Sequence, residues 1–226
     1  MDPKREPTAA ALRFLVFDLD ETLYPPRTGL FYEVGQRIHR YLEETMGLPS
    51  AEVAQVRRDY YERYGTTLRG LQLHHNVHSD AYLRYVHDVD VSRYLHPDPA
   101  LDAALGTLHH EKVIFTNATA EYAWRVLNVL GVARHFRRIL DIYALGFHCK
   151  PNPEAYRILL EALPARGPEC LLIEDNLRNL RGGKALGMHT LLVSPEREEE
   201  DGADWVVTSA AQVPEVVRAL EPRFPA

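Results

Sequence analysis

The chain has 226 residues, of which 46% are hydrophobic and 26% charged, a composition typical of one large globular domain or of a core domain carrying an insertion. Its formal net charge of −6 disfavours a nucleic acid polymer as partner, because the overall field would repel a phosphate backbone. The longest apolar runs have the length of strands, so no membrane span is expected.

The N-terminal segment and the two cysteines bear on the expected location of the protein in the cell. Residues 1–7 (MDPKREP) are polar and lack the apolar core of a secretory signal, and we expect a disordered leader over residues 1–11. Cys149 and Cys170 are isolated, without a CxxC pair or a disulfide-rich pattern. This usage is typical of a reducing cytoplasm, which is the predicted location.

Compact apolar runs bounded by polar residues predict buried strands. They lie at residues 13–18, 112–116, 170–174, 189–193 and 205–208. Helical patterns lie between them. One is capped by Thr119 and ends at Gly131, another has Pro153 in its first turn, and a third opens at Asn176 and ends at Gly187. This alternation predicts an α/β fold, a Rossmann-like parallel sheet flanked by helices on both faces.

The stretch directly after the first strand breaks this alternation. It reads as helices alone, at about residues 31–45, 51–64 and 80–86. We therefore expect an inserted all-helical cap over residues 27–95. The α/β core would consist of residues 12–26 and 96–226.

Asp18 and Asp20 follow the first predicted strand. In open α/β sheets, ligands bind beyond the carboxyl ends of the strands, and both carboxylates are expected to face that crevice. Two neighbouring carboxylates suit a division of labour between an ionised nucleophile or metal ligand and a proton donor. Taken alone, the pair could equally end a strand and cap a turn, where aspartate is common.

Other strand ends and loops favour the functional interpretation. Thr116-Asn117 offers a hydroxyl and backbone amides, Lys150 offers an ammonium group, and Glu174-Asp175 offers two acids that are costly to bury without a cation. A lone lysine in a loop is most often solvated, and Asp175 could serve as a helix cap. Together with Asp18, the set contains the groups that a hard cation and a phosphate require.

The order and spacing of these groups resemble the haloacid dehalogenase-like phosphatase superfamily over most of the chain, from Leu15 to about Val193. DLDET at residues 18–22 is similar to the first motif of the family, Thr116-Asn117 to the second, Lys150 to the third and Glu174-Asp175 to the fourth. The stretches LYPPRTGL, YYERYGTTLRGL and KPNPEAY further resemble the pyrimidine 5′-nucleotidase branch, which carries a helical cap after the first motif.

The resemblance implies a reaction and a cofactor. Asp18 would attack phosphorus and form an aspartyl-phosphate. Asp20 would protonate the leaving oxygen and later accept a proton from water. Mg²⁺ would be held by Asp18, by the backbone carbonyl of Asp20 and by Asp175. Glu174 would be a direct or water-bridged partner of the metal.

The remaining motif residues would support the transferred group. The resemblance implies that Thr116 and the backbone amide of Asn117 hold the phosphoryl oxygens. Lys150 would offset the negative charge on the nucleophile and the phosphoryl group. Thr22 would support the loop rather than react.

The resemblance also ranks related reactions. Dehalogenases lack an acid two residues after the nucleophile, so Asp20 favours phosphoryl transfer. A phosphonatase would need a cap lysine, and none occurs between Leu30 and Leu95. A sugar-phosphate phosphatase, a phosphomutase and a non-catalytic phosphate-binding protein stay open as alternatives.

The expected partner is a small phosphorylated metabolite, with a nucleotide as the first choice. The cap residues Arg69, His74 and His75 are candidates for contacts to a base or ribose, although neighbouring histidines in a polar loop are usually solvated. Tyrosines at helical spacing are more often part of an amphipathic core. The oligomeric state is left open.

Overall fold

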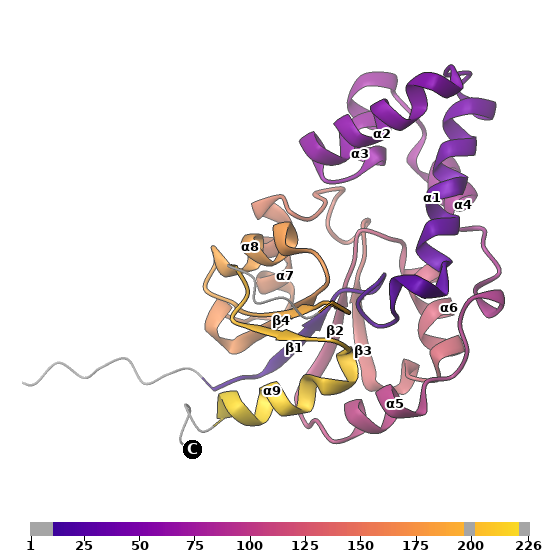
Figure 1. Cartoon of the computed structure of the whole chain (residues 1–226). Helices are drawn as coiled ribbons and strands as arrows, with labels where there is room; N and C mark the ends of the chain where they lie inside the picture. Colours follow the sequence, from indigo (N-terminus) through magenta and orange to yellow (C-terminus); the bar gives the residue numbers. More distant parts are fainter. Residues whose placement is uncertain (1–10, 197–201, 222–226) are drawn as a thin grey trace, which may run out of the picture.

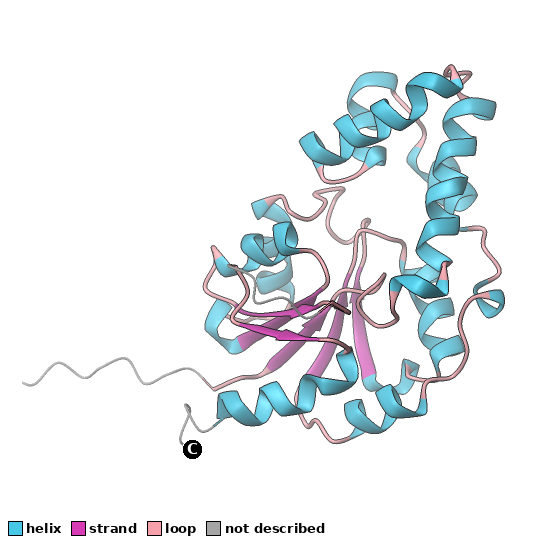
Figure 2. Ribbon diagram, in the orientation of Figure 1, coloured by secondary structure: helices cyan, strands magenta, loops and turns pink. Residues whose placement is uncertain are grey.

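The computed structural model describes residues 11–196 and 202–221, so nearly all of the expected leader lies outside the described residues. The core is a sheet of six parallel strands in the order β3-β2-β1-β4-β5-β6. This confirms the predicted parallel α/β fold (Figure 2). The strands are β1 (Phe14–Phe17), β2 (Glu111–Phe115), β3 (Phe136–Leu140), β4 (Cys170–Glu174), β5 (His189–Val193) and β6 (Trp205–Val207).

Helices cover both faces of the sheet because side chains on both sides of each central strand are apolar. Leu15 and Phe17 of β1 pack in one buried cluster, whereas Phe14 and Val16 pack in another. Such two-sided burial is typical of parallel sheets. The first cluster is covered by α5 (Pro99–Gly106), α6 (Ala120–Leu130) and α9 (Val213–Leu220), the second by α7 (Pro153–Ala162) and α8 (Leu177–Lys184).

Four further helices stand beyond the carboxyl ends of the strands, and we call them the helical cap (Figure 1). They lie within the predicted insertion and pack around a third hydrophobic cluster, to which Ile142 and Cys149 of the core also contribute. The division of the chain into separate domains at residues 27 and 95 stays a prediction. The cap helices are α1 (Leu30–Arg40), continued by a π-helical turn (Tyr41–Thr45), then α2 (Ser50–Tyr64), α3 (Thr67–His75) and α4 (Ser79–His87).

The structure contains elements that the sequence patterns did not predict. Strand β3 was missed because two exposed arginines interrupt its apolar run at the edge of the sheet. Helix α3 was missed because residues 65–70, which include two glycines, were interpreted as a separator. In fact Thr66 caps the helix by accepting a hydrogen bond from the Arg69 amide at 3.1 Å. Helices α5 and α9 were not predicted either.

The strand order determines where functional groups can meet. The chain winds outward from β1 through β2 and β3 on one side and through β4, β5 and β6 on the other. The carboxyl ends of β1, β2 and β4 therefore lie side by side at the point where the winding reverses, which is the usual ligand site of such sheets. Among residues 11–196 and 202–221, no helix combines the length and the hydropathy needed to cross a membrane.

Candidate active site

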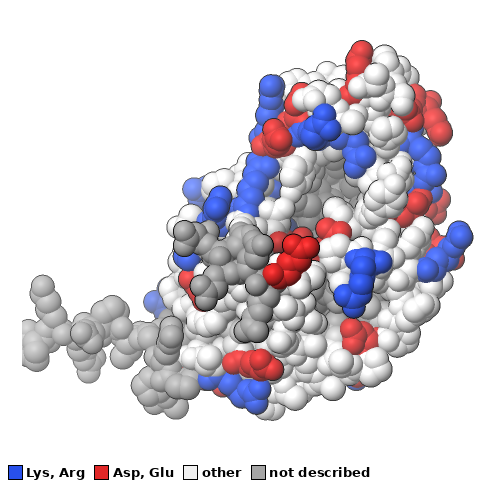
Figure 3. Space-filling model, in the orientation of Figure 1, with Lys and Arg blue, Asp and Glu red and all other residues white. Residues whose placement is uncertain are grey.

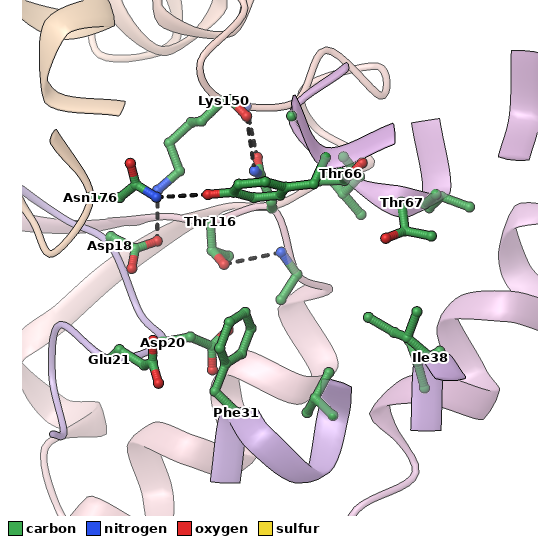
Figure 4. A pocket seen from close by; sticks show the side chains of 18 of the residues that line it. Asp18, Asp20, Glu21, Phe31, Ile38, Thr66, Thr67, Thr116, Lys150 and Asn176 are labelled. Atoms are coloured by element: carbon green, nitrogen blue, oxygen red, sulfur yellow. Dashed lines mark hydrogen bonds and ion pairs between the residues drawn. The ribbon is translucent and has the colours of Figure 1, made fainter. Parts of the chain in front are cut away.

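A cavity of about 590 Å³ lies between the carboxyl ends of the strands and the helical cap. The surface is hollowed in this region (Figure 3), and the close view shows side chains converging on it from both sides (Figure 4). Every motif residue predicted from the sequence lines it. These residues are Asp18, Asp20, Thr116, Asn117, Lys150, Glu174 and Asp175.

The ammonium group of Lys150 connects two of the strand ends. Its Nζ lies 2.6 Å from Oδ1 of Asp18 and 2.7 Å from Oε2 of Glu174. Asp18 directly follows β1, and Glu174 is the last residue of β4. Burial lowers the pKa of Lys150, but the charges of Asp18 and Glu174 together outweigh it and hold this pKa above its usual value. Lys150 is therefore charged at neutral pH although it is only 1% exposed.

Asp175 joins this cluster through Thr22. The hydroxyl of Thr22 lies 3.1 Å from Oδ2 of Asp18 and 3.1 Å from Oδ1 of Asp175 and can donate to either. It also accepts a hydrogen bond from the backbone amide of Asp175 at 3.0 Å. Thr22 thus fixes the chain after β1 to the chain after β4, and it holds the two carboxylates on the same side of the cavity.

The cluster carries more negative charge than Lys150 alone can compensate. Oxygens of Asp18, Glu174 and Asp175 lie within 4.8 Å of one another. Burial, followed by the charge of Glu174, raises the pKa of Asp18 to about 6. Burial and the charge of Asp18 raise the pKa of Asp175 to about 6, and burial raises that of Glu174 to about 7. A divalent cation would relieve this repulsion, so the residues fit a hard metal ion with oxygen ligands.

The three carboxylates differ in their free oxygens. Oε2 of Glu174 accepts from Lys150, and its Oε1 accepts from the Asn176 amide at 3.3 Å. Oδ1 of Asp18 accepts from Lys150, whereas Oδ2 of Asp18 and Oδ1 of Asp175 share the hydroxyl of Thr22, which can donate to only one of them at a time. Asp18 and Asp175 are therefore the better candidates for direct metal ligands, with Glu174 as their charged neighbour.

Asp20 has different surroundings, although it lines the same cavity. Oδ1 of Asp20 accepts a hydrogen bond from the Tyr24 hydroxyl and another, at 2.9 Å, from the Tyr122 hydroxyl. Burial is the largest cause that raises the pKa of Asp20 to about 7; the nearby charge of Asp18 adds to it and the tyrosine hydrogen bonds oppose it. A substantial fraction of Asp20 is then protonated at neutral pH, as a proton donor must be. Its side chain does not belong to the three-carboxylate cluster, so the metal contact through its backbone carbonyl stays a prediction.

Asn117 acts on Lys150 through its side chain. Its Nδ2 donates to the carbonyl of Lys150 at 3.2 Å, and its Oδ1 accepts from the amide of Lys150 at 2.8 Å. These paired bonds hold the backbone of the loop from which the lysine extends. Thr116 is buried, and its hydroxyl accepts from the Ala118 amide at 3.0 Å. Phosphate binding by Thr116 and by the amide of Asn117 stays a prediction.

Two residues of the core hold the end of α2 over the site. Nδ2 of Asn176 donates to the Tyr61 hydroxyl at 2.7 Å. Arg178 donates to the backbone carbonyls of Tyr61, at 2.9 Å, and of Glu62. Just beyond, Gly65 packs so closely on the loop that a Cβ there would lie 2.3 Å from the Lys150 carbonyl oxygen. The same loop that carries the lysine thus also supports the cap.

The cap residues predicted to contact the substrate lie elsewhere. Arg69 donates to Gln72 at 3.2 Å. His74 and His75 are exposed at the end of α3, where they contact the hydroxyls of Tyr64, at 2.6 Å, and Tyr60, at 2.8 Å. None of the three lines the cavity. The reason is the rotation of α3, which turns Thr67, Leu68 and Leu71 inward instead.

Sequence reasoning missed two tyrosines that hold Asp20 and several residues of the cavity wall. Tyr24 lies four residues after Asp20, a spacing that could have drawn attention to it, whereas the hydroxyl of Tyr122 has no distinguishing sequence pattern. The cavity-lining residues that were not predicted include Arg57, Tyr61, Tyr82 and His87.

Comparison with known families decides the assignment. The family of haloacid dehalogenase-like hydrolases matches residues 12–187. The chain belongs to this family. The matched region includes every residue of the cluster described above, and it agrees with the family that the sequence motifs resemble.

Curated relatives share parts of the sequence. Phosphate metabolism protein 8 of Saccharomyces cerevisiae is 27% identical over 206 residues, which cover 83% of this chain and 64% of the yeast protein. Pyrophosphatase PpaX of Halalkalibacterium halodurans is 29% identical over 119 residues, or 49% of this chain and 55% of that protein. The chain therefore spans less than two thirds of the length of these two curated relatives.

Solved structures share the fold. L-2-haloacid dehalogenase from Xanthobacter autotrophicus superposes with a TM-score of 0.60 at 19% identity, covering 92% of this chain and 99% of that one. The HAD-hydrolase YfnB from Bacillus subtilis, bound to magnesium, gives 0.62 at 18% identity, covering 92% and 100%. A HAD phosphatase from Thermococcus onnurineus gives 0.61 at 18% identity, covering 91% and 98%. Dehalogenases and phosphatases thus share this fold, which cannot by itself select the reaction.

The Lys150 bridge leads to a prediction about stability. Lys150→Met leaves Asp18 and Glu174 buried without their cation, and it should lower the free energy of unfolding by about 3 kcal/mol. Adding Glu174→Gln removes one of the two carboxylates, so the double variant should recover at least about 1 kcal/mol. Urea denaturation in EDTA measures both. A loss below about 1 kcal/mol in the single variant would contradict this account.

A second prediction concerns His87, which lines the cavity from the end of α4. It stacks on Tyr122 with ring centres 4.6 Å apart, and its Nδ1 lies 3.2 Å from the Thr119 hydroxyl. Burial, with a smaller contribution from Arg125, lowers the pKa of His87 to about 3. The folded protein therefore keeps the imidazole neutral, whereas the unfolded chain protonates it near pH 6.5.

A histidine whose pKa is lowered by folding stabilises the folded state at pH values above its pKa in the unfolded chain. This stabilisation is lost as the pH falls below about 6.5. Between pH 7.5 and 5, His87 should therefore reduce the free energy of unfolding by about 2 kcal/mol. His87→Gln should lack this part of the pH dependence, as measured by urea denaturation at both pH values. The same change at exposed His75 serves as control, and an equal effect of the two variants would refute the assignment.

Proposed function

We propose that this hydrolase is a Mg²⁺-dependent phosphomonoesterase that acts through an aspartyl-phosphate on Asp18. The observation that carries the proposal is the division of roles between two neighbouring carboxylates. Asp18 is bound to a charged lysine and belongs to the carboxylate cluster, whereas Asp20 is held by two tyrosines with its pKa raised to about 7. One carboxylate is thus prepared to attack, and the other to transfer a proton.

In the first step, an oxygen of Asp18 forms a bond to phosphorus and the bond from phosphorus to the ester oxygen breaks. Asp20 gives its proton to that leaving oxygen, so the alcohol departs neutral. Lys150 and the chain at Thr116-Asn117 compensate the negative charge that the phosphoryl oxygens carry. Burial and the charge of Glu174 raise the pKa of Asp18, and the charge of Lys150 partly offsets this rise.

In the second step, water attacks the phosphorus of the aspartyl-phosphate. Asp20, now ionised, takes the proton of this water while the bond between phosphorus and Asp18 breaks. Inorganic phosphate and the original carboxylate result, and Asp20 is again protonated. The tyrosine hydrogen bonds occupy Oδ1 of Asp20 in the structure, which leaves Oδ2 for the exchange of protons.

Asp18 and Asp175, with Glu174 beside them, would hold Mg²⁺. When bound, the ion would supply positive charge for the transferred phosphoryl oxygens and for the carboxylate cluster. The match with YfnB, which was solved with magnesium, supports this choice of metal.

Phosphate esters are favoured over halogenated acids because of Asp20. A halide leaves without a proton, whereas an alkoxide needs one, so a carboxyl group with a raised pKa next to the nucleophile serves only the ester. The phosphate-related names of two curated relatives agree with this choice. A phosphomutase would use the same carboxylates and stays the second candidate.

For the substrate we propose a small phosphorylated metabolite, with nucleoside monophosphates first and sugar phosphates as the alternative. The similarity of the cap sequence to pyrimidine 5′-nucleotidases supports the nucleotide. For the compartment we propose the cytoplasm, since both cysteines are free and buried.

A panel of monophosphates, with Mg²⁺ or with EDTA, tests this function through the release of phosphate. We expect turnover only with the metal. Asp18→Asn should lower the rate at least about 10⁴-fold, because it removes the nucleophile. No turnover on a broad panel would reject the proposal, and a preference for sugar phosphates over UMP and CMP would favour the alternative substrate.

Asp20→Asn separates the proton donor from the nucleophile. It should slow the hydrolysis of alkyl phosphates by about 10² to 10⁴-fold. The loss should be much smaller for formation of the phosphoenzyme from p-nitrophenyl phosphate, whose leaving group departs unprotonated; stopped-flow release of nitrophenolate measures this step. Glu21→Gln, which changes the neighbouring acid, is the matched control. Equal losses on both classes of ester would show that Asp20 is not the acid.

A further inference from the structure

The cap side of the cavity is largely apolar. Its walls are formed by Val34 and Ile38 of α1, Leu68 of α3, and Leu83 and Val86 of α4. Figure 4 shows Ile38 across the open space from Lys150 and Asp18. A polar group in these surroundings is costly unless it is satisfied. Several polar side chains of the cap nevertheless line the cavity, and two of them, Arg57 and Tyr82, make no hydrogen bond with any other described residue.

The first is Arg57 of α2, which is partly buried and lines the cavity. Its guanidinium group makes no hydrogen bond or ion pair with any residue in the described part of the chain, 11–196 and 202–221. It reaches across to α1, where a Cβ on Gly35 would lie 3.2 Å from its Nη2. The absence of a side chain at Gly35 therefore makes room for the guanidinium group. Neighbouring Arg58, by contrast, donates to Gln55 at 2.7 Å.

The second is Tyr82 of α4, which lines the cavity and is only 2% exposed. Its ring packs edge-to-face on Tyr41, with centres 5.0 Å apart. Among the residues that the structure describes, none forms a hydrogen bond with its hydroxyl. Burial lowers the pKa of Arg57 and raises that of Tyr82, and each group partly offsets the shift of the other. The two side chains thus come from different helices and act on each other electrostatically.

Both side chains line the cavity with donors that no described residue accepts, and a guanidinium group can only donate. A ligand that supplies an acceptor oxygen would satisfy both Arg57 and Tyr82 at once. We propose that Arg57 and Tyr82 form a leaving-group subsite that binds a carbonyl or carboxylate oxygen of the substrate, separate from the phosphate site at Asp18 and Lys150. This inference rests on the proposed function.

The subsite narrows the class of substrate. The leaving group must have an apolar face to contact the walls and an oxygen acceptor to reach the cap. A pyrimidine base with its carbonyl oxygen has both, whereas a phosphorylated carboxylic acid such as 3-phosphoglycerate supplies the acceptor oxygen with little apolar surface. Ribose 5-phosphate carries the same phosphate ester as a nucleotide but lacks the base, so it measures the phosphate site alone.

The test compares binding of UMP, 3-phosphoglycerate and ribose 5-phosphate by calorimetry in EDTA, where the proposed metal-dependent turnover is stopped. Arg57→Met keeps the length of the side chain and removes its donors. It should weaken the binding of UMP, of 3-phosphoglycerate or of both at least 10-fold, a factor that a charged hydrogen bond can supply, while ribose 5-phosphate changes less than about twofold. Arg63→Met, on the exposed side of the same helix, is the matched control.

Tyr82→Phe is the second variant, because it keeps the ring in its packing and removes only the hydroxyl. Tyr82→Phe should weaken the binding of the same ligand that Arg57→Met affects. The affinity should fall about three- to tenfold, which is typical of one neutral hydrogen bond. A loss confined to UMP identifies the acceptor as a base carbonyl, and a loss confined to 3-phosphoglycerate identifies it as a carboxylate. An equal effect on all three ligands, no effect, or no binding of UMP and 3-phosphoglycerate by the unaltered protein would overturn the subsite.

Turnover of the unaltered protein with Mg²⁺ is measured in parallel. Selective binding without turnover would reject the proposed phosphatase and retain the subsite. Turnover of ribose 5-phosphate and UMP with no dependence on Arg57 would retain the proposed phosphatase and reject the subsite. The two ideas can therefore fail separately.

Discussion

The ammonium group of Lys150 lies between Asp18 and Glu174, and the geometry of the site depends on this contact. Carboxylates end two neighbouring strands at the centre of the sheet, where burial and mutual repulsion would drive them apart or keep them protonated. The lysine binds both at 2.6 and 2.7 Å. Its own position depends on Asn117, which holds the loop from the second strand. Three strand ends are thus connected by one residue, two through the ammonium group of Lys150 and the third through its backbone.

This arrangement leaves the site with an excess of negative charge. One lysine faces three clustered carboxylates. Burial is the largest cause that raises the pKa values of Asp18, Glu174 and Asp175, and the charges of neighbouring carboxylates raise them further. A bound divalent ion would reduce the repulsion between these carboxylates. The proposed affinity for a metal would therefore follow from holding Asp18 beside other acids, and the protein without metal would be less stable as a result.

Reaction and recognition are divided between the two parts of the fold. The groups proposed for chemistry stand on the sheet or on loops that leave it, where neighbouring strands restrain them. The groups proposed for the leaving group, Arg57 and Tyr82, stand on cap helices. Asn176 and Arg178 of the core hold the end of α2 in place. Changes in the cap could therefore alter the substrate without disturbing the carboxylates, as long as these contacts and the close packing of Gly65 are kept.

The sequence by itself determined the parallel α/β fold, the helices after the first strand and the motif residues that line the cavity, because buried strands and their polar ends leave local patterns. It did not reveal β3, an edge strand whose exposed arginines interrupt the apolar pattern. Nor could it show that Arg69, His74 and His75 turn away while Arg57 and Tyr82 enter the cavity. Which face of a cap helix meets the substrate depends on how that helix rotates against its neighbours. That rotation is decided by packing between residues far apart in the chain, such as Gly35 against Arg57, and only the tertiary structure shows it.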